Sequence, residues 1–504
     1  MNTTILDHLE ITERRFGDKI AYADKDGSVT FTELRQKASA LGSCLLEKGF
    51  DREPVVIFMC KGVKNIVSFF GAAYAGCFYV PIDVDMPEDR IRLIFSVLSP
   101  RVAIFDDSSR KKVTGSDLFN GIAFLDYDES AFGDRDDNLL AAARKDMKST
   151  DLLYVLFTSG STGVPKGVTI SHAAVLDFME WICARYELDE NVILCSQAPF
   201  YFDASLPDLV IPICVGATLM IPPKTYYTFP KKILQYIVEH RINTLIWVPS
   251  ALCNVVNCNA FEVCVPDSVK LVIFCGEVMP CRHLNVWRHY ISDAKYVNMY
   301  GPTEATYACT YYDIDREYAD DEKLPLGRAC ENSSIILLGE NGEPAGEGEI
   351  GEICILGQCL SNGYYNNIEK TSEAFVQNPL NTKWIELMYK TGDLARSENG
   401  VLIFEGRKDF QIKRLGHRIE LGEIENAILS NPEVRQACCV FDPESCDISA
   451  IYAGELEEAE LSGRLKDLIP HYMMPNAYHK LAALPLNLNG KIDRVKLSTE
   501  YGRK

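Results

Sequence analysis

Positive charge is scarce in this 504-residue sequence. The 51 lysine and arginine residues are outnumbered by 71 aspartate and glutamate residues, which gives a formal net charge of −20. Nucleic acids and anionic membrane surfaces attract basic proteins, so this balance argues against both as partners. It does not exclude a local basic patch on an otherwise acidic surface.

Long hydrophobic runs are also missing. The most apolar stretch, residues 66–82, is interrupted by serine, glycine and proline and falls short of the ~20 residues that span a membrane. Residues 1–15 carry three acidic side chains and no apolar core of the kind that a signal peptide requires. We therefore expect no integral membrane segment, and we read residues 66–82 as a buried helix followed by a strand.

Paired Cys-x-x-Cys motifs, the usual sign of a structural zinc site, are absent although the chain has 18 cysteines. Many cysteines without a signal peptide are typical of free thiols in a reducing compartment. The sequence therefore predicts a cytoplasmic protein with no disulfide framework.

A loop rich in glycine and hydroxyl side chains follows an apolar strand at residues 152–157. Glycines let the backbone approach a phosphate, while hydroxyls and a lysine can bind its oxygens. The candidate ligands are Thr158, Ser159, Gly160, Ser161, Thr162, Gly163 and Lys166. The loop is not a Walker A motif, because Pro165 stands where that motif has glycine. A flexible Ser/Gly linker is the alternative, which the buried strand directly before the loop disfavours.

Residues 1–150 alternate strand and helix patterns, which predicts parallel strands covered by helices. A helix is expected from Phe31, with Thr32 as its N-cap. Residues 106–147 are polar and are expected to form surface connections. Further along, two strands end in polar, glycine-containing stretches at residues 275–277 and 300–306, where parallel sheets bind ligands.

The strand spacing shortens from about residue 334, which indicates a small β-rich subdomain up to about residue 408. Residues 409–504 carry mixed helix and strand signals, enough for a separate small domain. The predicted fold class is α/β. It has a large N-terminal domain of doubly wound sheets (residues 1–408, including the β-rich subdomain) and a small mobile α+β C-terminal lid (residues 409–504).

Taken together and in this order, these stretches resemble the ANL superfamily of adenylating enzymes, which includes acyl-CoA ligases, luciferases and peptide-synthetase adenylation domains. The resemblance covers nearly the whole chain. It is greatest to the free-standing D-alanine–D-alanyl carrier protein ligases, in the stretches 197–203 and 274–278. It implies an ATP-dependent ligase that forms an acyl-adenylate and passes the acyl group to a thiol.

The resemblance also implies roles for individual residues. Lys491 matches the catalytic lysine of the lid, Glu304 a Mg²⁺ ligand and Asp409 the hinge between the two domains. Asp393 and Arg407 match the residues at the ribose hydroxyls, and Tyr300 matches the residue that stacks near the adenine. The remaining nucleotide-binding positions are Gly276, Glu277, Asn298, Gly301 and Thr303, in addition to the loop at residues 158–166.

Asp203 is the most informative substrate residue, because in amino-acid-activating members this carboxylate pairs with the substrate ammonium. The other pocket positions implied by the resemblance are uncharged: Ala204, Pro207, Ile246, Ile273, Cys275, Met299, Tyr307 and Ala308. They favour a small or apolar amino acid, and Cys275 matches the D-alanine pattern. Ala204 and Tyr307 depart from it, since Leu and Val are usual there.

The expected acceptor is the phosphopantetheine thiol of a separate carrier protein, because only 13 residues follow Lys491. The expected reaction is the activation of a small amino acid, D-alanine above all, with ATP and Mg²⁺. Three alternatives stay open at this point: another small or apolar amino acid in a nonribosomal peptide pathway, an acyl-CoA or aryl-CoA synthetase, and a degenerate homologue that only binds a nucleotide or a partner. Asp203 argues against the synthetase, and the intact Lys166, Glu304, Asp393 and Lys491 argue against the inactive homologue.

Overall fold

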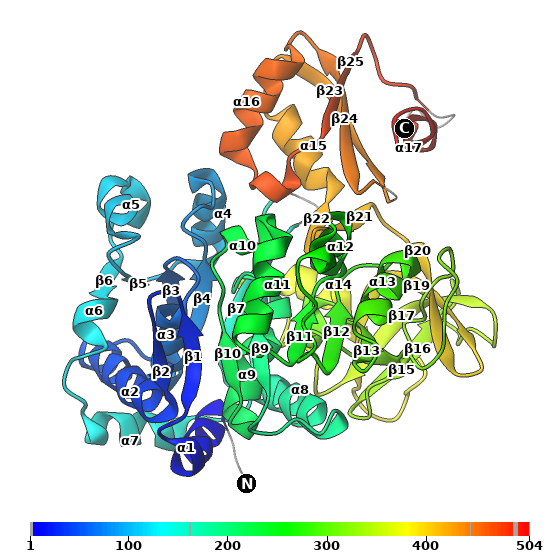
Figure 1. Cartoon of the computed structure of the whole chain (residues 1–504). Helices are drawn as coiled ribbons and strands as arrows, with labels where there is room; N and C mark the ends of the chain where they lie inside the picture. Colours follow the sequence, from blue (N-terminus) through cyan, green and yellow to red (C-terminus); the bar gives the residue numbers. More distant parts are fainter. Residues whose placement is uncertain (1–3, 161–162, 444, 487–491, 503–504) are drawn as a thin grey trace. The chain divides into compact units, whose positions relative to one another are not determined.

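The computed structural model describes residues 4–160, 163–443, 445–486 and 492–502 (Figure 1). The chain forms two compact units. The first comprises Met1–Val84, Pro100–Leu156 and Val168–Lys408, and the second comprises Asp85–Ser99, Phe157–Gly167 and Asp409–Lys504. Within the described residues, no helix is long and apolar enough to cross a membrane. The fold is thus α/β, with a large N-terminal sheet region and a smaller C-terminal one, as the sequence predicted.

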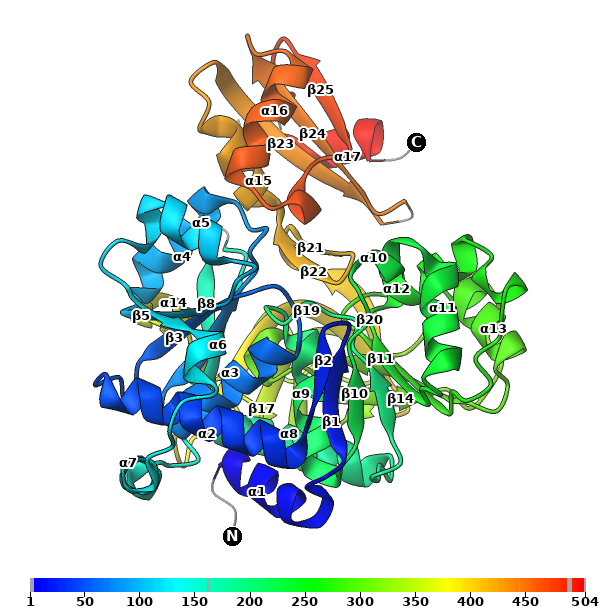
Figure 2. The same ribbon diagram turned by 60° about the vertical axis from the view of Figure 1, so that its left-hand side comes forward.

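A nine-stranded sheet forms one half of the first unit, in the order β15-β14-β13-β12-β11-β9-β10-β1-β2. Figure 2 labels the strands β14, β11, β10, β1 and β2 of this sheet. Its central strands run parallel. Successive residues of these strands point into different cores, because strand side chains alternate between faces. Leu245 and Trp247 pack with helices α11 and α13, whereas Ile246 packs in the same core as α8 and α9. Both faces of the sheet are therefore covered.

The elements of this half are β1 (Ile20–Asp24), β2 (Gly27–Thr30), β9 (Ile193–Cys195), β10 (Thr218–Met220), β11 (Thr244–Trp247), β12 (Leu271–Cys275), β13 (Lys295–Tyr300), β14 (Thr310–Asp313) and β15 (Arg328–Ala329). Its helices include α1 (Ile5–Phe16), α8 (His172–Arg185), α9 (Leu206–Val215), α10 (Thr225–Thr228), α11 (Pro230–Glu239), α12 (Pro249–Asn257) and α13 (Cys281–Tyr290).

The second sheet has six strands in the order β6-β5-β3-β4-β7-β8. They are β3 (Pro54–Phe58), β4 (Phe78–Ile82), β5 (Val102–Phe105), β6 (Ala123–Asp126), β7 (Leu152–Thr158) and β8 (Lys166–Ser171). The accompanying helices are α2 (Phe31–Glu47), α3 (Val63–Tyr74), α5 (Arg110–Gly115), α6 (Tyr127–Ser130) and α7 (Asp137–Asp146). The buried runs of β4 and β7 confirm the strands predicted within residues 66–82 and at residues 152–157.

Two local predictions were wrong. Residues 106–147 are not only surface connections, because β6 pairs in parallel with β5 and extends the sheet. Helix α2 is capped by Thr30 and not by Thr32: the Thr30 hydroxyl accepts the Glu33 amide at 3.2 Å, and Glu33 accepts the Thr30 amide at 2.9 Å. This reciprocal capping box satisfies two otherwise unpaired donors, whereas Thr32 already lies inside the helix.

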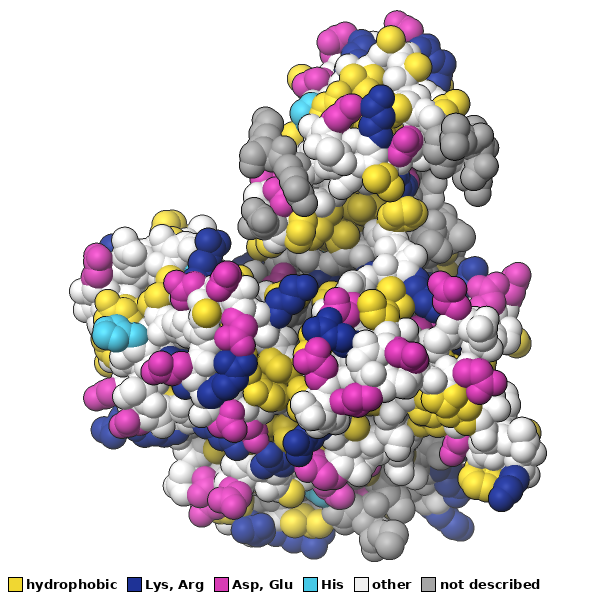
Figure 3. Space-filling view, turned by 90° about the vertical axis from the view of Figure 1, so that its right-hand side faces the viewer, with side chains coloured by type: hydrophobic (Ala, Val, Ile, Leu, Met, Phe, Trp, Pro, Cys, Tyr) yellow, Lys and Arg dark blue, Asp and Glu magenta, His cyan; other side chains and the backbone are white. Residues whose placement is uncertain are grey.

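The β-rich part of the first unit is a five-stranded antiparallel sheet in which β20 pairs with β19 beside the order β16-β17-β19-β18. The strands are β16 (Ser333–Leu338), β17 (Ile350–Gly357), β18 (Phe375–Gln377), β19 (Leu387–Glu398) and β20 (Val401–Arg407), with helix α14 (Ile368–Ala374). Figure 3 shows acidic and basic side chains interspersed on the face of the molecule turned to the viewer.

The second unit has its own apolar core. A three-stranded sheet, β23-β24-β25, packs through Ile451 and Tyr452 into two small clusters of buried side chains. Its elements are α4 (Glu88–Leu98), β21 (Gln411–Arg414), β22 (His417–Glu420), α15 (Leu421–Leu429), β23 (Val434–Asp442), β24 (Asp447–Gly454), α16 (Glu458–Leu468), β25 (Ala477–Leu481) and α17 (Arg494–Tyr501).

Candidate active site

The residues directly after β13 form the centre of the candidate site in the first unit. The segment 300–304 leaves the sheet at its carboxyl end and enters a short 3-10 helix, Thr303–Ala305. Gly301 is required here, because a Cβ at this position would lie 2.5 Å from the Tyr307 carbonyl oxygen. The tight fold brings residues 301 and 307 together and presents the side chains of Tyr300, Thr303 and Glu304.

Tyr300 joins this segment to the β-rich sheet. Its hydroxyl donates to Asp393 Oδ2 at 2.5 Å, and Arg407 donates to Oδ1 of the same carboxylate. The Asp393 amide donates to the Thr391 hydroxyl at 3.0 Å. Asp393 is 3% exposed, so this is a buried carboxylate that a guanidinium compensates. The structure therefore gathers three of the predicted ribose and adenine residues into one hydrogen-bonded cluster.

Thr303 joins the same segment to Asp203. The Thr303 hydroxyl donates to Asp203 Oδ2 at 2.6 Å across 100 residues of sequence. Asp203 begins the short 3-10 helix Asp203–Ser205 that precedes α9, and its side chain is half-buried. One segment of five residues thus hydrogen-bonds two carboxylates, Asp393 through Tyr300 and Asp203 through Thr303.

The predicted side-chain pocket is brought together by three adjacent parallel strands. Ile246 on β11 pairs with Ile273 on β12, and Cys275 on β12 pairs with Met299 on β13. These four side chains share one buried core with two further predicted positions, Tyr307 and Ala308. The half-buried Ala204 packs against the same core. Pro207 is buried in the first turn of α9. These side chains are uncharged, and their role as the wall of a substrate pocket stays a prediction.

Tyr307 has an unusual backbone conformation. Thr306 and Tyr307 both lie at positive φ, 51° and 78°, in the left-handed region that bulky residues rarely adopt. The Tyr307 ring is 3% exposed and meets the Phe178 ring edge to face at 5.4 Å between centroids. Burial raises its pKa far above the usual value, with Cys275 and Asp203 among the neighbouring groups that contribute. Backbone strain of this kind is concentrated at functional sites.

Glu304 is fully buried, and its Oε1 accepts the Tyr364 hydroxyl at 2.8 Å. No group of three or more metal-ligating side chains occurs within the described residues. A single carboxylate nevertheless fits Mg²⁺ in a phosphate-transfer site, because that ion is commonly held by one or two carboxylates together with substrate phosphates. Glu304 is therefore compatible with its predicted role.

The glycine- and hydroxyl-rich loop belongs to the second unit. The Ser159 hydroxyl donates to the Arg418 carbonyl at 2.9 Å and accepts the Glu420 amide at 3.2 Å. The Gly160 amide donates to a Glu423 carboxylate oxygen at 3.3 Å. A backbone amide of the loop thus already donates to a carboxyl oxygen in this structure.

Gly160 is required by a close approach, because a Cβ there would lie 2.0 Å from the Val164 carbonyl oxygen. The Thr158 hydroxyl is buried and has no hydrogen-bond partner among the described residues. An unpaired buried donor is costly, which suits a site completed by a ligand. Ser161 and Thr162 lie outside the described residues, as does Lys491.

The remaining predicted residues have structural contacts of their own. Glu277 accepts the Ser250 amide at 2.9 Å, and Asn298 donates to the Pro325 carbonyl at 2.7 Å. Gly276 has a φ of 102° at the end of β12. Asp409, the first residue after the large unit, accepts the Gln411 amide at 3.2 Å. The roles predicted for these residues stay predictions.

Sequence reasoning missed three side chains that the fold places at the site. Thr391 contacts the amide of Asp393, Tyr364 binds Glu304, and Tyr154 has a buried hydroxyl without a partner among the described residues. Thr391 could have been noticed, because it stands two positions before Asp393. Tyr364 and Tyr154 carry no local signal, since only the folded chain brings them close.

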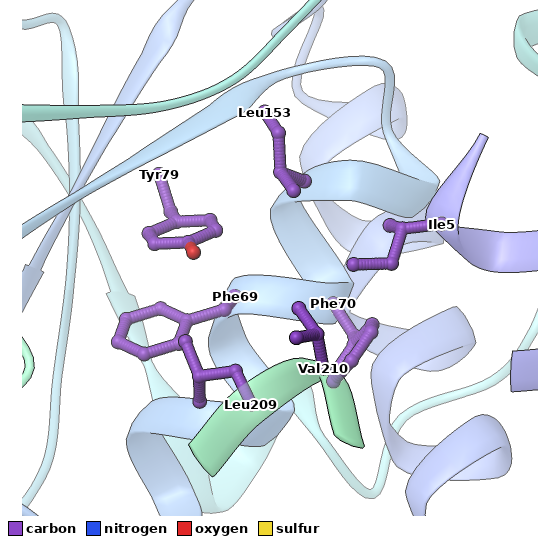
Figure 4. Close-up of a pocket in the computed structure, with 7 residues that line it drawn as sticks. All are labelled: Ile5, Phe69, Phe70, Tyr79, Leu153, Leu209 and Val210. Atoms are coloured by element: carbon purple, nitrogen blue, oxygen red, sulfur yellow. The ribbon is translucent and has the colours of Figure 1, made fainter. Parts of the chain in front are cut away.

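Two cavities of the first unit are each too small for an amino acid. One, of about 10 Å³, is lined by apolar side chains around the Tyr79 hydroxyl (Figure 4). The other, of about 20 Å³, lies beside Lys61, Asp83 and Tyr201. Each is the size of a single water molecule. The candidate site is therefore defined by its hydrogen-bonded side chains and not by either cavity.

Comparison with known proteins identifies the family. Residues 9–365 match the AMP-binding enzyme family, and residues 423–491 match the AMP-binding enzyme C-terminal domain. The chain is 32% identical to a D-alanine–D-alanyl carrier protein ligase of Listeria monocytogenes, over 100% of both chains. It is also 32% identical to zwittermicin A synthase ZmaJ of Bacillus cereus, over 99% of its own length and 95% of that protein.

The fold agrees with this assignment. The crystal structure of IdnL1 superposes with a TM-score of 0.83 at 25% identity, covering 96% of this chain and 99% of that one. The matches to the family extend over most of the sequence. The chain therefore belongs to the family of AMP-binding, adenylate-forming ligases.

Proposed function

We propose that this ligase activates a small amino acid with ATP and transfers it to the phosphopantetheine thiol of a separate carrier protein, with D-alanine as the amino acid. The observation that carries the proposal is the segment 300–304, which hydrogen-bonds Asp393 at one end and Asp203 at the other. A carboxylate for ribose hydroxyls and a carboxylate for an ammonium group would be tied to one short piece of backbone. The full-length likeness to a D-alanine–D-alanyl carrier protein ligase supports the same reading.

In the first half-reaction, a carboxylate oxygen of the amino acid attacks the α-phosphorus of ATP, and pyrophosphate leaves as an aminoacyl-AMP forms. We assign the substrate ammonium to Asp203 and the ribose hydroxyls to Asp393, with Arg407 holding that carboxylate in place. Glu304 would hold Mg²⁺, which supplies charge neutralisation at the phosphates. The loop at residues 158–166 would bind the β- and γ-phosphates through its amides and hydroxyls.

In the second half-reaction, the carrier thiol loses its proton and attacks the acyl carbon, and AMP leaves as the thioester forms. We assign Lys491 to the first half-reaction and Asp409 to the hinge that exchanges one half-reaction for the other. The eighteen cysteines all lie in the described residues and are free thiols, in keeping with the proposed cytoplasmic location.

The residues at the predicted pocket positions support a small amino acid. The Tyr307 ring occupies buried space beside Cys275 and packs on Phe178. A methyl group that clashes with a packed wall costs about 1–3 kcal/mol, so longer side chains are disfavoured by tens-fold or more. We therefore assign a substrate side chain no larger than a methyl group.

The test is amino-acid-dependent exchange of labelled pyrophosphate into ATP, with D-alanine, L-alanine, glycine, serine, valine and propionate as substrates. D-alanine should give the highest kcat/KM, and propionate should be inactive. Loading of a phosphopantetheinylated carrier protein should follow the same order. Preference for an L-amino acid would overturn the D-alanine assignment alone, whereas preference for propionate or a fatty acid would overturn amino acid activation.

A further inference from the structure

The stretch that carries Asp203 into the site is not part of any helix or strand. It leaves β9 after Cys195 and runs through residues 196–202 before the short helix at Asp203. Its backbone carbonyls therefore lack the partners that a sheet or helix would supply. Buried carbonyls need a donor from elsewhere, so the contacts made by this stretch decide where Asp203 lies.

Lys61 supplies such a donor. It lies in the connection between β3 and α3, and β3 belongs to the six-stranded sheet of the same unit. Its ammonium donates to the Ala198 carbonyl at 2.7 Å and contacts the Ser196 carbonyl at 3.4 Å. It also lies 5.1 Å from the centre of the Phe200 ring. Three residues of the stretch are thus held by one cation that comes from a different sheet.

Asp208, which follows Asp203 in the sequence, binds the beginning of the same stretch. It lies in the first turn of α9, is 1% exposed, and accepts the Ser196 hydroxyl at 2.5 Å. Tyr227 makes a third contact with Ser196, in addition to those of Lys61 and Asp208, because its hydroxyl donates to the Ser196 carbonyl at 2.7 Å. The stretch is therefore fixed at its start by Lys61 and Tyr227, and it is tied to the helix that follows Asp203 through Ser196 and Asp208.

We propose that Lys61 is a positioning residue for amino acid binding: it holds the stretch 196–202 so that Asp203 meets the substrate ammonium. The inference rests on the proposed function, since it needs Asp203 to bind the amino acid. Lys61 does not touch the substrate in this arrangement. It acts by fixing the backbone that carries Asp203, and the Thr303 hydroxyl then fixes the carboxylate itself at 2.6 Å.

Lys61 changes its charge at mildly alkaline pH, so we expect amino acid binding to depend on pH in that range. Burial lowers the pKa of the Lys61 ammonium to about 8, although Asp208 and Cys195 act to raise it. Burial likewise raises the pKa of the Asp208 carboxyl to about 7, against the pull of Lys61. The titratable and charged groups around Lys61 on the neighbouring elements are Asp24, Lys64, Asp83, Cys195, Asp208 and Tyr227.

Three variants separate positioning from mere stability. Lys61→Met keeps the length of the side chain and removes the ammonium, Lys61→Arg keeps a permanent cation, and Lys64→Met removes a nearby lysine that pairs with Asp128 instead. At pH 7, Lys61→Met should raise the KM for the amino acid about ten-fold and leave the KM for ATP unchanged. The KM of Lys61→Arg for the amino acid should stay within about three-fold of the wild-type value. The KM of Lys64→Met should equal the wild-type value.

The pH dependence is measured as the ratio of the wild-type KM to the Lys61→Arg KM at each pH, which cancels titration of the substrate itself. Between pH 7 and pH 9.5 this ratio should rise about five-fold, because the wild type loses its cation and arginine does not. The ratio of the Lys61→Met KM to the Lys61→Arg KM should stay constant over the same pH range. If Lys61→Met does not fold, Ser196→Ala takes its place. This variant should also raise the KM for the amino acid, by less than the roughly ten-fold increase expected for Lys61→Met.

Two results would overturn the inference: equal increases in the KM for ATP and for the amino acid in Lys61→Met, or an unchanged KM ratio across the pH range. Both leave the proposed function standing, because the wild type would still exchange the amino acid. The proposed function fails by a different result, namely no exchange by the wild type with any amino acid.

Discussion

The Thr303 hydroxyl donates to Asp203 Oδ2 at 2.6 Å, which ties the candidate substrate carboxylate to the segment that also carries Glu304 and Tyr300. The bond fixes the rotamer of Asp203 before any substrate is present. A binding group held in one orientation loses less entropy when the ligand arrives. With the roles we propose for Asp203 and Asp393, the positions of the amino acid and of the nucleotide would thereby be coupled through one segment of backbone.

Asp203→Ala should remove the preference for amino acids over their des-amino analogues. The substrate ammonium would lose its buried counter-charge, a change of roughly 3–5 kcal/mol, so kcat/KM for alanine should fall at least 100-fold. Activity towards propionate, which needs no counter-charge, should not fall. Pyrophosphate exchange with the two acids measures both numbers. If the variant keeps its discrimination, the ammonium binds elsewhere.

Tyr307→Val should widen the range of amino acids. Removing the ring opens the wall beside Cys275, so valine and serine should gain tens-fold in kcat/KM relative to alanine. The contact with Phe178 is lost as well, and the thermal midpoint should fall. Tyr296→Val is the matched control, because this buried tyrosine on β13 bonds the Ile291 carbonyl at 2.9 Å away from the predicted pocket. A control that widens specificity equally would exclude Tyr307 as the cause.

Lys491→Ala should abolish pyrophosphate exchange, by 100-fold or more, and leave the fold intact. A cation at the developing charge is worth several kcal/mol in catalysis. Transfer to the carrier from a supplied aminoacyl-adenylate should survive, because we assign that step to another arrangement of the chain. Equal loss of both half-reactions would contradict the two-step assignment of Lys491.

Asp409→Pro should separate the half-reactions in the opposite sense. Proline fixes φ near −65° and removes an amide donor, which restricts rotation at the proposed hinge. Adenylate formation should persist, while carrier loading should fall at least ten-fold in single-turnover assays. Gln411→Ala, two residues along the chain, is the control and should load normally. Unchanged loading by Asp409→Pro would place the hinge elsewhere.

His172 should make stability depend on pH in mildly acidic solution. The side chain is 1% exposed and its Nδ1 accepts the Ile5 amide at 3.4 Å, an interaction that requires a neutral ring. Burial, aided by Arg144, lowers its pKa to about 4. The unfolded chain therefore binds a proton first as the pH falls. The stabilisation is present above pH ~6.5 and is lost progressively down to pH ~4, about 2 kcal/mol by pH ~5.

The check is the thermal midpoint of the wild type and of His172→Asn at pH 7 and pH 5. Asparagine does not titrate, so the gap between the two proteins should narrow at the lower pH. His289→Asn, which replaces a histidine in the last turn of α13, serves as the control. A gap that widens at pH 5 would mean that His172 is protonated in the folded protein.

The elements with strong local patterns could be predicted from the sequence. The continuous apolar runs of β3, β4 and β7 indicate strands buried on both faces, and the glycine-rich loop after β7 follows from its composition. Strand β6 could not be predicted in the same way, because its first two residues are exposed and it is an edge strand. The pairing with β5 supplies what its own pattern lacks.

What the sequence by itself determined is which chemical groups this protein has and the order in which they occur along the strands: Asp203 after β9, Cys275 in β12, Tyr300 in β13, and Asp393 in β19. Which of them meet was decided only by the tertiary structure. Tyr300 and Asp393 are 93 residues apart, and Thr303 and Asp203 are 100 apart. No local propensity encodes such pairs, because each joins elements that are far apart in the sequence and meet only in the folded chain. Lys61 and Ser196 are the clearest case, since they are 135 residues apart and only packing between two sheets brings a lysine without any motif to the stretch that precedes Asp203.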